Sequence, residues 1–108
     1  MYAILDDAPR IILGGVVVGI PQNTNLNDLK TRGKKYVSVS GAYSSTMSNL
    51  PTHEAATVGF ELMYFSGYTN TYGCQLLFNH LGTYIRYQSV SNGTAFGEWK
   101  KIVVESIQ

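Results

Sequence analysis

The sequence predicts an all-β domain, either a small antiparallel β-sandwich or a knob built from one twisted sheet. Short runs rich in β-branched and aromatic residues alternate between apolar and polar positions, and Gly, Asn and Ser separate these runs. Helical periodicity is nearly absent. A chain of 108 residues, of which 14% are charged, has room for one hydrophobic core and no second lobe.

The N-terminal segment, residues 1–22, contains the apolar run IILGGVVVGI. This run is too short to cross a bilayer, which needs about 20 apolar residues. It also follows Asp6 and Asp7, where a signal peptide carries Lys or Arg. We therefore predict no membrane insertion. The run is expected to form a buried or subunit-covered strand pair, bent at its Gly-Gly step, ahead of a β-rich domain over residues 23–108.

One segment is a candidate for a helical turn. Between Asn23 and Thr31, Asn25 is placed to cap a single turn that contains Asp28. The basic run KTRGKK that follows straddles a glycine and is expected to be a solvated turn. Because the formal net charge of the chain is only +1, this run does not predict a positively charged surface that binds nucleic acid.

Further strands are expected after this turn. KKYVSVS and TVGFELMYF both alternate, so each has two distinct faces. YGCQLLFN and TYIRYQSV form a hairpin over residues 72–90, in which Gly82 is expected to supply a positive φ. EWKKIVVE follows the turn signal SNGT and is expected to be the closing strand of the sheet.

No catalytic or metal-binding pattern is present in the sequence. Cys74 is the single cysteine, which excludes an intramolecular disulfide and a Cys-rich zinc site. The two histidines, His53 and His80, have no evident third partner that would orient them for nucleophilic catalysis. The seven acidic residues nominate no carboxylate pair of the kind that hydrolyses glycosides. We therefore predict that the protein is not an enzyme and has no catalytic residue, metal or cofactor.

Aromatic residues are abundant, with eight Tyr, four Phe and one Trp. Tyrosine combines a ring face with a hydroxyl group, which suits sugar rings and wet protein surfaces. Two polar loops, residues 41–55 and 66–73, have the Tyr, Ser, Asn and Gly content of antibody paratopes, although the alternative is that they are only solvated connections. The residues that we predict to bind a ligand lie in or beside these loops: Tyr43, Tyr68, Asn70 and Tyr72.

Other aromatic residues lie within the expected strands, where packing is their usual role. Arg86 lies between two tyrosines in the sequence. Its guanidinium group has two candidate roles, which are paired hydrogen bonds to a ligand and a structural cation–π contact with an aromatic ring. We favour the structural cation–π contact. The side chain of the single tryptophan, Trp99, is expected to pack in the hydrophobic core. The residues predicted to be structural are therefore Tyr36, Tyr84, Arg86 and Trp99.

The order of several motifs resembles the pyocin-knob type of domain. These motifs are NLNDLKTRGKKYVS, NLP, GFELMYF, QLLF, TYIRYQS and WKKI, and they span Asn23 to Val104. Domains of this type occur at the C-terminal ends of phage tail fibres, other phage appendages and R-type pyocin fibres. Two positions depart from the family pattern: Arg32 stands where a Pro usually precedes the glycine, and Phe96 stands near where a second Trp often lies.

The resemblance implies a β-rich knob that assembles as a homotrimer on a virion, in a tail fibre or another surface projection. Its partners would be its own copies, other fibre proteins through residues 1–22, and a glycan or protein of the bacterial surface. Residues 99–101 would be a clasp that pins the last strand onto the sheet. The leading hypothesis is a non-enzymatic, multivalent receptor-binding protein. The alternative is a structural virion component, such as a fibre-capping, trimerisation or capsid or tail decoration module.

Overall fold

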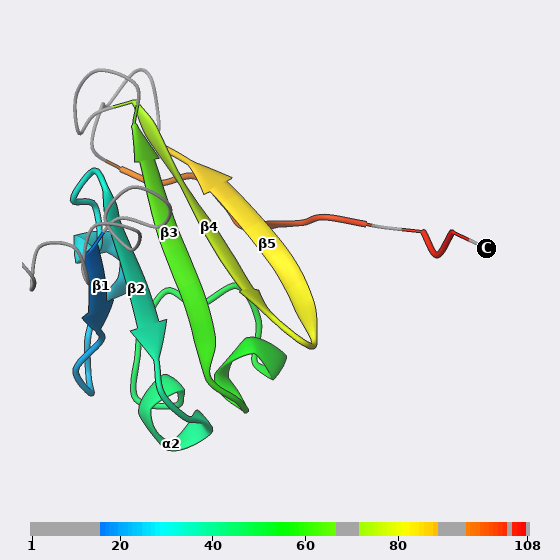
Figure 1. The fold of residues 1–108 in the computed structure, drawn as a ribbon, viewed down its shortest axis with the longest axis horizontal. Helices are drawn as coiled ribbons and strands as arrows, with labels where there is room; N and C mark the ends of the chain where they lie inside the picture. The colour runs from blue at the N-terminus through cyan, green and yellow to red at the C-terminus, as the bar shows by residue number, and fades with distance from the viewer. Residues whose placement is uncertain (1–15, 67–71, 89–94, 104, 108) are drawn as a thin grey trace, which may run out of the picture.

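The computed structural model describes residues 16–66, 72–88, 95–103 and 105–107. These residues form one six-stranded sheet whose strands follow chain order (Figure 1). The strands are β1 (Val16–Gly19), β2 (Lys34–Ser38), β3 (Phe60–Ser66), β4 (Gly73–Asn79), β5 (Gly82–Tyr87) and β6 (Lys100–Lys101). The prediction of a mostly β protein is confirmed, and of the two expected architectures the described residues adopt the single sheet.

The sheet is mixed, because β1 and β2 are parallel while every later neighbouring pair is antiparallel. The expectation of a fully antiparallel sheet is therefore wrong at its first pair. Parallel neighbours need a crossover connection, and residues 20–33 supply it. This connection contains the 3₁₀ turn η1 (Leu26–Asp28), and the side chain of Asn25 caps that turn by accepting from the amide of Asn27, as predicted.

Three local features differ from the sequence predictions. Gly82 does not supply a positive φ, because Asn79 Oδ1 accepts a hydrogen bond from the Leu81 amide and forms the β4–β5 turn. The closing strand β6 is only two residues long, and the chain after it leaves the sheet (Figure 1). A short helix, α2 (Gly41–Ser44), begins where only a loop was expected, because the Ser40 side chain caps its first turn.

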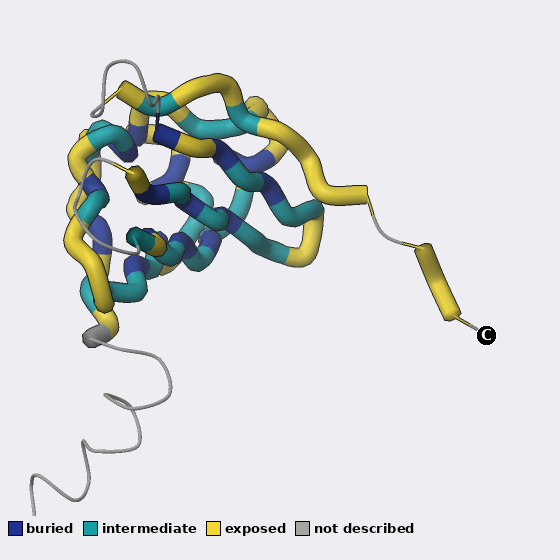
Figure 2. Tube along the Cα trace, turned by 90° about the horizontal axis from the view of Figure 1, so that it is seen from above, coloured by how far each residue is buried: buried dark blue, intermediate teal, exposed yellow. Residues whose placement is uncertain are grey.

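The hydrophobic core lies on one face of the sheet. The register aligns Tyr36, Leu62, Leu77 and Tyr84 in one row across β2 to β5, and all four are buried. The connecting segments, including the 3₁₀ turn η2 (Glu54–Ala56), add the remaining buried apolar side chains that do not come from strands: Ile20, Leu26, Leu29, Met47 and Ala55. Figure 2 shows how buried and less buried positions alternate along the strands.

A polar bridge joins the first connection to the middle of the sheet. Gln75 in β4 is fully buried, and its Nε2 donates to the carbonyl oxygens of Leu26 at 2.7 Å and Leu29 at 2.9 Å. Its Oε1 accepts from Arg86 Nε at 2.8 Å. Because buried polar groups are costly without partners, this one amide holds η1 against the sheet and also orients the guanidinium of Arg86.

Candidate functional site

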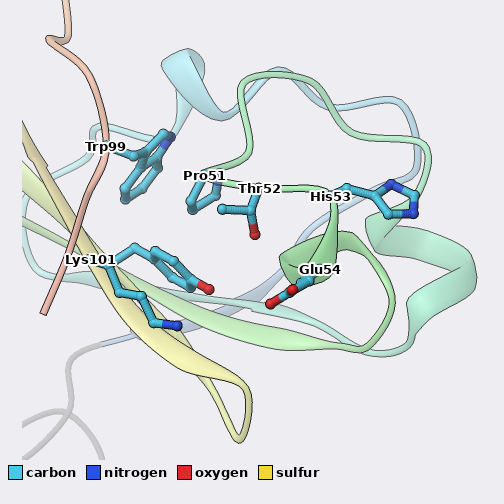
Figure 3. Close-up of a pocket in the computed structure, with 7 residues that line it drawn as sticks. Pro51, Thr52, His53, Glu54, Trp99 and Lys101 are labelled. Carbon is cyan, nitrogen blue, oxygen red and sulfur yellow. The ribbon is translucent and has the colours of Figure 1, made fainter. Parts of the chain in front are cut away.

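A pocket of about 340 Å³ opens between the loop that leads into η2 and the β5–β6 edge of the sheet. Its lining combines two aromatic rings with a hydroxyl, a carboxylate and an ammonium group. The lining residues are Pro51, Thr52, His53, Glu54, Tyr84, Trp99 and Lys101. In Figure 3, Thr52, Glu54 and Lys101 point into the space beside the Trp99 ring, while the imidazole of His53 points away.

The loop side of the pocket is held by its own hydrogen bonds. Thr52 Oγ1 accepts from the amide of Ala55 at 3.1 Å, and the hydroxyl of Thr57 donates to the carbonyl oxygen of Glu54 at 2.7 Å. These bonds define the single turn of η2, and Pro51 restricts the backbone just before it. The Glu54 carboxylate therefore projects from a turn whose backbone is already ordered.

The indole of Trp99 is anchored at its edge. Trp99 Nε1 donates to the carbonyl oxygen of Asn49 at 2.8 Å, although the two residues are 50 positions apart in the sequence. Asn49 has a positive φ of 65°, a conformation that Asn tolerates better than most residues. Its side-chain amide donates to Asn25 Oδ1 at 2.7 Å. The ring is thereby tied, through the loop, to the cap of η1.

Arg86 lies against the aromatic rings of Trp99 and Phe96. Its guanidinium carbon is 4.6 Å from the Trp99 ring centroid and 4.3 Å from that of Phe96. Burial lowers the pKa of Arg86 to about 10, so the side chain stays protonated near neutral pH. Its buried Nη2 has no hydrogen-bond partner among the described residues. Because the charge is desolvated, the two ring faces are an important part of its stabilisation, and the stack holds the indole in place.

The floor of the pocket is Tyr84, which is only 2% exposed. The register places Lys101 of β6 directly opposite it, and Lys101 Nζ is 5.9 Å from the centroid of the Tyr84 ring. Lys101 and Glu54 are both exposed, so their charged groups are available to a ligand.

This arrangement is suited to binding a polyhydroxylated ring. The apolar face of a sugar packs on an indole, and its hydroxyl groups exchange hydrogen bonds with hydroxyl, carboxylate and ammonium groups. The described part of the chain brings no three His, Cys, Asp or Glu side chains together as metal ligands. No helix among the described residues is long and apolar enough to cross a membrane.

The fold is similar to that of a solved structure of the R1 pyocin fibre of P. aeruginosa, which comprises a C-terminal portion of that fibre. The two agree with a TM-score of 0.68 over 93% of this chain, at 14% sequence identity. The chain has the fold of part of a pyocin fibre. It spans 24% of the length of that fibre chain. No family model matches the chain, and no curated protein matches its sequence.

The predicted ligand-binding residues do not form one cluster in this pyocin-fibre fold. Tyr43 lies on α2 and is 36% exposed, whereas Tyr72 immediately precedes β4 and is 60% exposed. The helix follows the end of β2 that pairs with the start of β3, and β4 begins beside the end of β3. Tyr43 and Tyr72 are therefore at opposite ends of the sheet. Tyr68 and Asn70 lie outside the described residues.

The residues predicted to be structural lie in or beside the core. Tyr36 and Tyr84 are buried core residues, and Arg86 is buried in its stack. Trp99 packs against the core but also lines the pocket.

Sequence reasoning did not predict that Trp99 lines a pocket together with Thr52 and Glu54. The available signal was a polar loop and a lone Trp followed by lysines, but the sequence does not show that these segments meet.

Proposed function

We propose that the protein is a non-enzymatic component of a phage or pyocin tail fibre that binds the bacterial host surface, with a surface glycan seated in the pocket beside Trp99. The observation that carries this proposal is the convergence of Thr52, Glu54 and Lys101 on one side of an anchored indole. The pocket contains one carboxylate, Glu54, whereas glycoside hydrolysis generally uses two. This chemistry supports binding rather than cleavage.

The likeness to a fibre supports assembly with other fibre proteins on a virion or a pyocin particle. A homotrimer would hold three pockets together, and linked sites exceed the affinity of a single site by about 10²- to 10⁴-fold without any new contact. We propose residues 1–22 as the segment that attaches the domain to the rest of the fibre. Loop residues Tyr43, Tyr68, Asn70 and Tyr72 remain proposed as additional contacts with the receptor.

The single tryptophan makes the pocket directly testable, because every change in intrinsic tryptophan fluorescence reports on Trp99. Purified surface polysaccharide from each candidate host strain is titrated into the protein, and labelled protein is incubated with intact cells of the same strains. We expect a saturable fluorescence change and saturable cell binding for at least one strain.

A pocket variant, Glu54→Gln/Lys101→Met, is expected to lose tenfold or more in affinity, because hydrogen bonds to charged groups are worth about 1.5–3 kcal/mol each. The matched control is Glu98→Gln/Lys100→Met. Glu98 and Lys100 flank the same tryptophan and are exposed, but they do not line the pocket. Equal binding by both variants, or no binding by the folded protein to hosts of the parent particle, would overturn the proposal.

The alternative function is a structural fibre module, such as a cap or a trimerisation domain. The observation that favours it is the second face of the sheet, on which the apolar side chains Phe65 and Tyr87 are half exposed. A purely structural module would assemble with its partners and leave both the polysaccharide and the cells unbound.

A further inference from the structure

The two charged groups that face the pocket beside Trp99 do not neutralise each other. Glu54 lies on the loop wall and Lys101 on the β6 wall, and both side chains point into the space between these walls (Figure 3). Both are exposed, and neither forms a salt bridge with another residue in the part of the chain that the structure describes. Their charges are therefore available to a bound molecule.

A second positive charge lies against the indole. The guanidinium carbon of Arg86 is 4.6 Å from the centroid of the Trp99 ring, and Arg86 is only 4% exposed. Among the described residues, its side-chain contacts are the Gln75 amide and two aromatic rings, none of which carries a negative charge. The charge of Arg86 is therefore not compensated by these contacts.

The burial of Arg86 increases the effect of its charge on the pocket. Arg86 does not line the pocket, so its charge acts there through packed protein rather than through water. The effective dielectric constant in proteins is about 20, against about 80 in bulk water, which makes an interaction between charges about fourfold stronger at the same distance. Salt also screens a buried charge less than an exposed one.

The pocket consequently has an excess of positive charge. Lys101 and Arg86 contribute two positive charges and Glu54 contributes one negative charge, so one positive charge is in excess. The remaining ionisable side chain of the charged loop wall, His53, points away from the pocket (Figure 3). A ligand that carries a negative charge is therefore favoured over a neutral ligand of the same shape.

The two walls are suited to different groups of one sugar unit. Glu54 accepts hydrogen bonds from ring hydroxyl groups. Thr52 Oγ1 already accepts from the amide of Ala55, which leaves its hydroxyl hydrogen to donate to the ligand. A negatively charged group on the same sugar faces Lys101 on the opposite wall, where it pairs with the ammonium group and stays away from the carboxylate.

From these observations we infer that the pocket selects an acidic saccharide, meaning a sugar unit that carries a carboxylate or a phosphate group, and that Lys101 determines this selectivity. The inference rests on the proposed function, because it concerns the glycan that this pocket binds. It also goes beyond that function, because a neutral sugar would equally satisfy the indole and the hydroxyl contacts.

The test uses the surface polysaccharide that gives the largest Trp99 fluorescence change in the titration described above. This polysaccharide is compared with two derivatives of itself. In one, the carboxyl groups have been reduced to alcohols with carbodiimide and borohydride, and in the other the phosphate groups have been removed with hydrofluoric acid. We expect one derivative to bind the full-length protein at least tenfold more weakly, which corresponds to about 1.4 kcal/mol. The derivative that loses affinity identifies the acidic group.

Three single variants test the role of Lys101, and circular dichroism checks that each is folded. Lys101→Met removes the ammonium group but keeps a side chain of similar length, and it is expected to bind the native polysaccharide and its derivatives equally. The matched control, Lys100→Met, removes the same charge from the same strand at a residue that does not line the pocket, and should keep the wild-type preference. Glu54→Gln should keep or increase the preference, because it removes a negative charge from the pocket.

Two outcomes would overturn the inference and leave the proposed function intact. In the first, the wild type binds the native polysaccharide and both derivatives with the same affinity, which shows that the pocket accepts a neutral glycan. In the second, Lys101→Met keeps the full preference for the native polysaccharide, which assigns the selectivity to another residue. If no polysaccharide changes the Trp99 fluorescence, the proposed function and the inference both fail.

Discussion

At the scale of single residues, the buried amide of Gln75 has three hydrogen-bond partners. It supplies two donors to the backbone of the first connection and one acceptor to Arg86. Arg86 in turn stacks on Trp99. A change at Gln75 therefore affects both the packing of η1 and the support of the pocket.

We predict that Gln75→Leu lowers the free energy of unfolding by about 2–4 kcal/mol, because two buried carbonyl oxygens and one charged donor lose their partner. Urea denaturation followed by circular dichroism measures the loss. The control, Gln22→Leu, makes the same change at an exposed position and is expected to stay within about 0.5 kcal/mol. A loss below about 1 kcal/mol for Gln75→Leu would show that water satisfies these groups in its absence.

At the scale of elements, the position of α2 depends on close contact with the backbone of Thr57 and Val58. The hydroxyl of Ser44 donates to the carbonyl oxygen of Val58 at 2.8 Å, which fastens the helix to the chain before β3. A Cβ atom at Gly41 would overlap the carbonyl group of Thr57. The helix therefore sits too close to this backbone for any residue other than glycine.

Gly41→Ala is predicted to destabilise the protein by about 1–3 kcal/mol, which is the usual range for overpacking. The sign of this stability change tests the close approach, because helix propensity alone favours alanine over glycine by about 1 kcal/mol and so predicts a more stable variant. Gly19→Ala in β1 is the control, since a Cβ there meets nothing within 4 Å. Thermal unfolding of both variants tests the prediction, and an unchanged or raised Tm for Gly41→Ala would contradict it.

At the scale of the whole molecule, the pocket lies at the β5–β6 edge of the sheet, and its floor is Tyr84 of the core face. If copies assemble as proposed above, the strength of host attachment depends both on the affinity of each pocket and on the number of pockets that bind at once.

Local chemistry made much of this fold predictable from sequence. The alternation in β2 and β3, the β4–β5 hairpin and the Asn25 cap depend on neighbours a few residues away, so the sequence alone determines them. The order of the motifs resembles the pyocin-knob type of domain, and the similarity to a pyocin fibre structure confirms the fold that this resemblance implies.

Only the tertiary structure decided which face became the core and where the pocket lies. Alternation gives each strand two faces, but it does not say that Tyr36 and Ser38 point into the core while Val37 lies on the opposite face. That choice depends on which face the long connections cover. The pocket likewise exists because Trp99 meets a loop about 50 positions earlier in the chain. Such long-range contacts depend on the packing of the whole chain, and local sequence patterns do not encode them.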